Sequence, residues 1–228
     1  MRVFDVVVFD ILGTMVDEPG GLRAAVREAV PDCEPGRAER LLGVWQGHVA
    51  REQRRMAEGG RAYADSATLD AEAARRVAQL AGVRDESAIA RLATASERLH
   101  PWDDSAAGLT ALARHVPVMG LSHASRTTLL RLNAHAGLRW HQLLSADDAR
   151  AHKPAPEVYR LALDAAGCPP ERALMVAAHA WDLRGAQRVG MRTAYVHRPV
   201  GDPPRAEDRF DHCFEGLAGV VRLLGRDG

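Results

Sequence analysis

The 228-residue sequence contains few cysteines, few aromatic residues and no long apolar run. Its three cysteines, Cys33, Cys168 and Cys213, are odd in number and far apart, so we expect neither a disulfide framework nor a cysteine metal site. No apolar stretch approaches the roughly twenty residues that a membrane-spanning helix needs. The sequence therefore predicts a soluble protein of the reducing cytoplasm.

A net charge is also lacking, because 30 basic and 30 acidic residues cancel. Proteins dedicated to nucleic acids or to anionic membranes usually carry an excess of basic residues. We therefore expect neither of these partners, and a small molecule is the expected ligand. A chain of this length buries enough surface to fold without a metal or disulfide staple.

The N-terminal region predicts one strand followed by a long helical insertion. Val3–Phe9 is a β-branched and aromatic run, typical of a strand buried on both faces. After an expected turn at 18–21, residues 22–99 are rich in Ala, Arg, Glu and Leu without any strand-like run, which indicates four or five helices. The predicted division is a core domain of residues 1–17 and 100–228 and an inserted domain of residues 18–99.

From Trp102 onward, short apolar strands alternate with helical patterns. The expected strands are 116–121, 143–145, 174–177 and 193–196, and the expected helices are 125–135 with Ser125 as N-cap, 156–166, 182–189 and 217–224. This alternation predicts an α/β fold with a doubly wound, Rossmann-like parallel sheet and helices on both faces. In such sheets the functional residues lie at the carboxyl ends of the strands.

Asp10 ends the first predicted strand and is followed by Gly13 and Thr14. A carboxylate at this place is a candidate nucleophile, with the Thr14 hydroxyl to orient it. Lys153, in a loop before a helix, would hold a neighbouring carboxylate ionised. Ser122 follows another strand, where it can donate to Asp10 or to a substrate carboxylate. Each residue alone is as readily a turn or surface residue, but their common place at strand ends favours a shared site.

His179 and Asp182 lie three residues apart at a predicted strand-to-helix turn. Together they can activate a water molecule that hydrolyses an ester intermediate. Asp182 is also a candidate for the N-cap of its own helix, and one residue can serve both purposes. Trp181, between them, is expected either to line an apolar pocket or to pack in the core.

Taken in order, these segments resemble the four motifs of the haloacid dehalogenase superfamily, over nearly the whole chain. The helical insertion then corresponds to the cap domain of that family. Most members are magnesium-dependent phosphatases with further acids in the first and fourth motifs, where this chain has Leu12 and Ala178. Asp10 and Asp182 alone make a poor octahedral magnesium site. The resemblance therefore implies an enzyme without metal or cofactor.

The pattern is similar to the (S)-2-haloacid dehalogenase branch, whose members are often dimers, so a homodimer is implied. In the implied reaction Asp10 displaces the halide with inversion and forms an aspartyl ester, which water activated near His179, Asp182 and Lys153 then hydrolyses. A halide needs no proton on leaving, so Leu12 is compatible with this chemistry. The residues that the resemblance places against the substrate are Leu12, Trp45, Gln46, His123, Tyr159 and Trp181.

Departures from the branch keep the substrate open, and one of them is Val49 in place of a tyrosine. Gln46 replaces an arginine that receives the halide, and a neutral amide brings no positive charge. His123 replaces an asparagine. His179, also in place of an asparagine, resembles the cis-epoxysuccinate hydrolases, in which a histidine can protonate the leaving oxygen. We therefore keep three hypotheses: dehalogenation of a short 2-haloacid, hydrolysis of an epoxide, and a binding protein that has the fold but no turnover.

Overall fold

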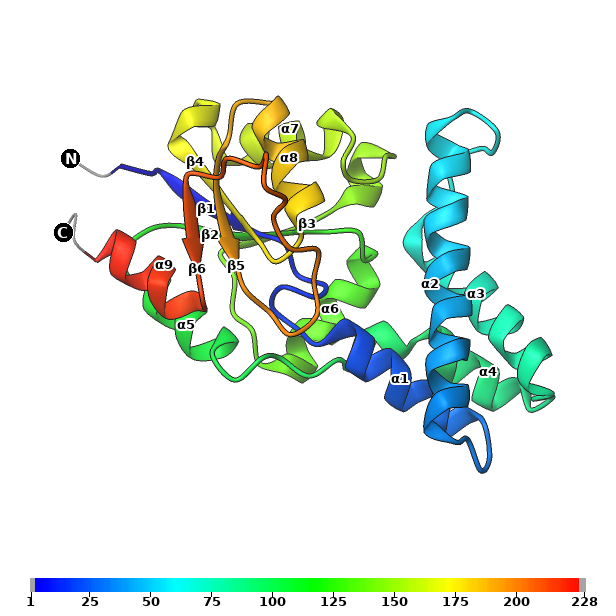
Figure 1. Cartoon of the computed structure of the whole chain (residues 1–228). Coiled ribbons are helices and arrows are strands. Elements are labelled where there is room, and N and C mark those ends of the chain that lie inside the picture. The colour runs from blue at the N-terminus through cyan, green and yellow to red at the C-terminus, as the bar shows by residue number, and fades with distance from the viewer. Residues whose placement is uncertain (1–2, 226–228) are drawn as a thin grey trace.

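A parallel β-sheet forms the centre of the computed structural model, which describes residues 3–225 (Figure 1). The strand order is β3-β2-β1-β4-β5-β6, and every neighbouring pair is parallel. The strands are β1 (Val6–Phe9), β2 (Val118–Ser122), β3 (Gln142–Ser145), β4 (Ala173–Ala177), β5 (Arg192–Val196) and β6 (His212–Phe214). The predicted doubly wound α/β fold is confirmed.

Helices cover both faces of this sheet, because alternate residues of its central strands face opposite apolar clusters. In β1, Val7 and Phe9 pack with α5 (Ser105–Leu112), α6 (Arg126–Ala136) and α9 (Leu217–Leu224). Val6 and Val8 pack on the other face with α7 (Pro156–Ala166) and α8 (Ala180–Arg188). The predicted cap of α6 is confirmed, because the Ser125 hydroxyl accepts from the Thr128 amide.

Between β1 and β2 the chain forms the expected helical cap. Its elements are α1 (Glu18–Ala29), α2 (Pro35–Ala57), α3 (Ser66–Ala81), α4 (Glu86–Ala93) and the short 3₁₀ helix η1 (Ala95–Arg98). They surround a separate apolar cluster that includes Leu22, Trp45 and Val77. No helix of the described part of the chain could span a membrane. The domain boundaries stay predictions, and residues 1–2 and 226–228, assigned to the core, lie outside the described residues.

Several sequence predictions need correction. The residues 18–21 form the first turn of helix α1 and not a separate turn. The Asp17 carboxylate caps this helix by accepting from the Gly20 amide at 2.9 Å. Pro19 lies in the first turn of the helix, where proline is tolerated. Strand β1 begins at Val6 instead of Val3. Strand β6 and helix α5 were not expected: β6 has only three residues, and α5 has almost no polar face.

The cap joins the core through two adjacent chain crossings. The Asp17 amide donates to the His100 carbonyl at 2.9 Å, and Val16 and Pro101 form an antiparallel bridge. The indole of Trp102 donates to the Gly13 carbonyl at 3.1 Å. Pro101 and Trp102 therefore pack at the crossing where the chain leaves the cap and enters the core.

A second attachment lies at the far end of the cap, in the connection of residues 58–65 between α2 and α3. The Tyr63 hydroxyl donates to Asp147 Oδ1 at 2.7 Å, and His152 Nε2 lies 3.2 Å from the Ala64 carbonyl. The rings of Tyr63 and His152 stack with centroids 5.4 Å apart. We call these contacts the clasp; they tie the cap to the core loop that contains Lys153.

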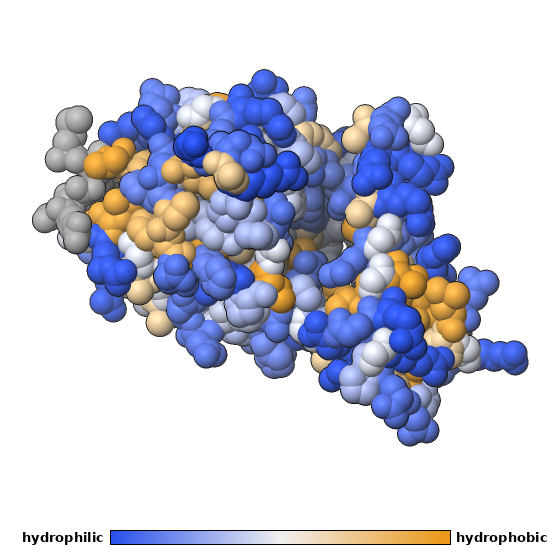
Figure 2. All heavy atoms as spheres, in the orientation of Figure 1, coloured by the Kyte–Doolittle hydropathy of each residue, from blue (hydrophilic) through white to orange (hydrophobic). Residues whose placement is uncertain are grey.

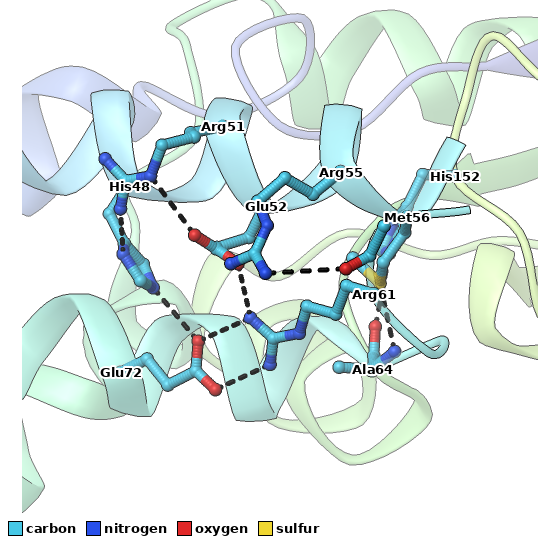
Figure 3. A network of polar contacts seen from close by, with 10 residues as sticks. His48, Arg51, Glu52, Arg55, Met56, Arg61, Ala64, Glu72 and His152 are labelled. Carbon is cyan, nitrogen blue, oxygen red and sulfur yellow. Dashed lines mark hydrogen bonds and ion pairs between the residues drawn. The ribbon is translucent and has the colours of Figure 1, made fainter. Parts of the chain in front are cut away.

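An ion network inside the cap holds this connection in place (Figure 3). Glu52 is buried in α2 and accepts from Arg55 and Arg61, each at 2.9 Å. Arg61 also makes two hydrogen bonds to Glu72 of α3. The hydrogen bond from Arg61 holds the pKa of Glu52 below its usual range. Because Arg61 belongs to the connection itself, the network fixes the direction from which Tyr63 reaches the core.

We expect Glu52→Gln to lower the free energy of unfolding by about 1–3 kcal/mol, because it removes the charge that satisfies the neighbouring arginines. Glu39→Gln is the matched control, since Glu39 is exposed and its pair with Arg23 lies at the surface, where such pairs contribute about 0.5 kcal/mol or less. Chemical denaturation of both variants measures the difference. Equal losses in the two variants would contradict the role given to the network.

Candidate active site

The Asp10 carboxylate is fixed at both of its oxygens just beyond the end of β1. The Thr14 hydroxyl donates to Oδ2 at 2.6 Å, and the Lys153 ammonium lies 3.0 Å from Oδ1. Thr14 is itself held, because its hydroxyl oxygen accepts from the Ala178 amide at 2.9 Å. The tight turn at Gly13, which has a positive φ of 79°, brings Thr14 back toward the aspartate. The carboxylate therefore has one fixed orientation.

Lys153 connects Asp10 to Asp182, which lies in the first turn of α8. Its ammonium donates to Asp182 Oδ2 at 2.7 Å, and the Tyr159 hydroxyl donates to Asp182 Oδ1 at 2.6 Å. Asp182 and Tyr159 have no exposed surface, and Lys153 is 5% exposed. The three charged groups thus form one buried chain of ion pairs.

The surroundings drive the pKa values of the two carboxyl groups apart. Burial alone would raise the pKa of Asp10, but the charges of Lys153 and His179 and the hydrogen bond from Thr14 outweigh burial and hold it below its usual range. Burial raises the pKa of Asp182, and the Lys153 charge does not offset it. Although burial disfavours its charge, Lys153 has a raised pKa because of the two aspartates. The surroundings thus favour the ionised form of Asp10 more strongly than that of Asp182.

His179 and Trp181 begin a row of rings beside this chain of ion pairs. Their ring centroids are 5.7 Å apart, and Trp181 in turn stacks on His123 at 6.1 Å. His179 Nε2 lies 3.3 Å from the Leu12 carbonyl, next to Gly13, where any side chain would collide with it. The imidazole therefore stands over the turn that follows Asp10.

A cavity of about 1020 Å³ opens between the cap and the core, and the surface is hollowed there in Figure 2. Residues of both domains line it. Those from the cap include Glu18, Leu22, Trp45, Gln46, Val49, Arg54, Tyr63 and Asp70, and those from the core include His123, Arg150, His152, Lys153 and Trp181. Asp10 is not part of the cavity wall itself, but Lys153 lines the cavity and contacts Asp10, so the candidate nucleophile lies one residue behind the wall.

The structure thus brings four sequence-predicted residues into direct contact, namely Asp10, Thr14, Lys153 and Asp182. Of the residues expected to contact substrate, the cavity wall includes Trp45, Gln46, His123 and Trp181. Trp181 therefore belongs to the pocket, which resolves the alternative that the sequence left open.

Four expectations differ from the structure. Tyr159 does not reach the cavity, because it is fully buried and donates to Asp182 instead. The Leu12 side chain packs against the core beneath the sheet end and is not part of the cavity wall. The buried Ser122 hydroxyl accepts from the Ala124 amide at 3.1 Å, and the side-chain hydrogen bonds of Asp10 come from Thr14 and Lys153 instead. Asp182 is not the N-cap of α8, because His179 occupies that position.

The acidic residues of the cavity wall, Glu18 of α1 and Asp70 of α3, were missed at the level of sequence. Asp70 gave no signal, because an acidic residue on a helix is usually solvated. For Glu18 a signal existed, because Asp17 followed by Pro19 is typical of a helix start. A helix that begins there places Glu18 in its first turn, next to the crossing between cap and core.

The donor set around Asp10 does not fit a magnesium ion. Residues 3–225 contain no group of three or more His, Cys, Asp or Glu side chains that could hold a metal. The position of a further acid in the fourth motif is Ala178, which contributes only its backbone amide, to Thr14. No step of the chemistry below is therefore assigned to a metal.

Comparison with known proteins agrees with this geometry. The family described as haloacid dehalogenase-like hydrolase matches residues 4–190. The (S)-2-haloacid dehalogenase of Xanthobacter autotrophicus is 33% identical over 195 residues, which cover 84% of this chain and 74% of that protein.

Two solved structures have the same fold. The L-2-haloacid dehalogenase PA0810 superimposes with a TM-score of 0.87 at 27% identity, over 98% of this chain and 99% of that one. The Xanthobacter autotrophicus enzyme with chloropropionic acid covalently bound gives a TM-score of 0.83 at 29% identity, over 97% and 98% of the two chains. The chain belongs to the haloacid dehalogenase-like hydrolases, in the (S)-2-haloacid dehalogenase branch of that superfamily.

Proposed function

We propose that the protein is a metal-independent hydrolase that converts a short (S)-2-haloacid to the (R)-2-hydroxy acid. The observation that carries the proposal is the Asp10 carboxylate, held by Thr14 and by Lys153, and Lys153 lines the cavity that cap and core share. The covalent chloropropionic acid complex of the Xanthobacter relative supports a covalent route. A cytoplasmic homodimer stays the proposed form of the enzyme.

In the first half-reaction an oxygen of Asp10 attacks C2 of the substrate opposite the halogen. A C–O bond forms, the carbon–halogen bond breaks, and the halide leaves with the bonding electrons, so C2 is inverted. The lowered pKa of Asp10 keeps its carboxylate ionised for this attack. Its fixed orientation removes much of the entropic cost of alignment. Because the halide leaves as an anion, the apolar Leu12 is sufficient where other members have an acid.

In the second half-reaction water attacks the carbonyl carbon of the Asp10 ester, and the bond between that carbon and the ester oxygen breaks. The product leaves with that oxygen, which takes up one proton of the water; Asp10 is regenerated as the carboxylate, and the other proton passes to solvent. His179 is the group we assign to accept the proton of the water, because its ring stands over the turn that follows Asp10. Lys153 and Thr14 face the oxygens on which negative charge develops. Asp182 acts through Lys153, because both of its oxygens are occupied.

A second candidate function is hydrolysis of an epoxide of the cis-epoxysuccinate type. The observation that favours it is the pairing of His179 beside Asp10 with Gln46 in the cavity wall. An epoxide oxygen leaves as an alkoxide and benefits from a proton, which a histidine can supply. The nucleophile and the ester intermediate are the same in both reactions, so the substrate alone separates them.

We expect halide release from (S)-2-chloropropionate and none from the (R) enantiomer. Asp10→Asn should abolish release, whereas Asp164→Asn, at an exposed position on α7, is the matched control and should retain it. Ion chromatography measures the halide. Tartrate from cis-epoxysuccinate without halide release would favour the epoxide function, and no turnover on either substrate would favour the binding protein.

The ester route makes a separate prediction about oxygen. In one turnover with enzyme in excess in heavy-oxygen water, the product hydroxyl should be unlabelled, because its oxygen comes from Asp10. The label should appear in the peptide that contains Asp10, as measured by mass spectrometry. Label in the product of the first turnover would instead indicate direct attack of water on the substrate.

Thr14→Val should raise the pKa of Asp10, because it removes a hydrogen bond that favours the carboxylate. Since the carboxylate is the reactive form, the acid limb of kcat/KM should move to higher pH, by about one unit for a bond of about 1.4 kcal/mol. Thr14→Ser keeps the hydroxyl and should leave the limb in place. An unshifted limb in the valine variant would show that Thr14 does not control this ionisation.

A further inference from the structure

The turn that follows Asp10 is held from outside by side chains that are distant in the sequence. Arg198, in the loop after β5, donates through Nε to the Thr14 carbonyl at 2.8 Å. The indole of Trp102 donates to the preceding carbonyl, that of Gly13, at 3.1 Å. Because the Thr14 hydroxyl orients the Asp10 carboxylate, these contacts act on the support of the candidate nucleophile.

Arg198 is itself fixed in the fold by two further groups. Its Nη1 lies 2.8 Å from Asp104 Oδ1, and its guanidinium lies over the Trp102 ring, 5.8 Å from the centroid. Asp104 Oδ2 in turn accepts from the Leu217 amide, at the start of α9, at 2.9 Å. The guanidinium thus connects the turn after Asp10 to α9 and to the chain segment that leaves the cap.

Stability alone does not explain why this guanidinium is buried. Arg198 is 8% exposed, and among the residues that the structure describes its Nη2 has no hydrogen-bond partner. A buried ion pair commonly contributes little to stability, because the loss of hydration offsets the attraction between the charges. The side chain of the partner, Asp104, is 37% exposed, and solvent weakens the pair further. The contact with Thr14 is therefore the one that suggests a function.

Thr14 is held at both ends by hydrogen bonds. The Ala178 amide donates to its hydroxyl oxygen at 2.9 Å, and Arg198 donates to its carbonyl oxygen. The side-chain hydrogen bonds of Asp10 come from Thr14 and Lys153, so Arg198 acts on Asp10 through Thr14 and not by direct contact. Arg198 is also not part of the cavity wall, so a role in binding the substrate does not account for it.

We propose that Arg198 is a positioning residue for the nucleophile, because its hydrogen bond to the Thr14 carbonyl determines where the Thr14 hydroxyl meets the Asp10 carboxylate. The inference rests on the proposed function, since the effect on rate arises in the attack of Asp10 on C2. Loss of Arg198 should leave the carboxylate out of line with the substrate, and small displacements of a reacting group cost about 10- to 100-fold in rate.

The first test is a double-mutant cycle on the first half-reaction. Arg198→Met removes the donor and keeps a long apolar side chain. It should slow formation of the ester from (S)-2-chloropropionate at pH 7 by about 10-fold or more in a single turnover, followed by the mass of the peptide that contains Asp10. In the Thr14→Val background the same substitution should change the rate by less than about 2-fold, because the hydroxyl that it positions is absent. Equal losses in the two backgrounds would overturn the proposal.

The pH profile separates positioning from a general loss of folded enzyme. A displaced Thr14 hydroxyl no longer favours the carboxylate, so the pKa of Asp10 should rise in Arg198→Met. The acid limb of kcat/KM should then move to higher pH, in the same direction as in Thr14→Val. Partial unfolding would lower the plateau and leave the limb in place. A limb at the wild-type pH would therefore overturn the positioning role.

Arg172→Met is the matched control. Arg172 makes two hydrogen bonds to Asp5, at 3.0 and 2.6 Å, next to the amino end of β4 and away from the active site. Its substitution also removes a charged pair of the core, but it should leave ester formation and the acid limb unchanged. Chemical denaturation gives the folded fraction of each variant, and rates are compared per folded enzyme. A loss of rate in Arg198→Met that disappears in this comparison would leave Arg198 only a structural role.

Crystal structures of the wild type and of Arg198→Met keep the inference testable if no chloro acid is turned over. The distance from Thr14 Oγ1 to Asp10 Oδ2, 2.6 Å here, should increase beyond about 3.2 Å in the variant, out of hydrogen-bond range. An unchanged distance would overturn the proposal whatever the substrate. A displaced Thr14 without halide release from either protein would support the positioning role and reject the dehalogenation.

Discussion

One buried ammonium group, the Nζ of Lys153, holds three parts of the core in register at the end of the sheet. It contacts Asp10 beyond β1 and Asp182 in the first turn of α8, so the loop before α7 is tied to both. Without this charge two carboxylates would share a site from which water is excluded, at a cost of several kcal/mol. Their pKa values differ because Lys153, His179 and Thr14 outweigh burial at Asp10, whereas burial outweighs Lys153 and Tyr159 at Asp182. Stability and reactivity thus depend on one cation.

Much of this arrangement could be predicted from the sequence, because parallel strands bring their carboxyl ends to one edge. From that rule alone, Asp10, Lys153 and Asp182 could be predicted to lie close together. It could not show that Tyr159 faces the core, because a helix position six residues after Lys153 is compatible with either direction. The strand β6 and the helix α5 lacked a clear periodic pattern, and their existence depends on packing against β5 and α9.

Cap residues were harder to predict than core residues, since no strand end marks them. Trp45 and Gln46 were found only through resemblance to a family, and the acids opposite them were not found at all. Glu18 and Asp70 belong to separate helices, and only the packing of α1 and α3 around the hinge makes them face one cavity. Charge composition could not reveal this either, because the chain is neutral as a whole.

The clasp described above has a consequence for how often the cavity opens. Tyr63 and His152 hold the far end of the cap with two hydrogen bonds, and each contributes about 0.5–1.5 kcal/mol net. Breaking both therefore adds roughly 1–3 kcal/mol to the free energy of opening, an energy gap at which a minor conformation remains measurably populated. Thermal motion can supply a free energy of this size, so these two hydrogen bonds alone do not prevent the far end of the cap from separating from the core.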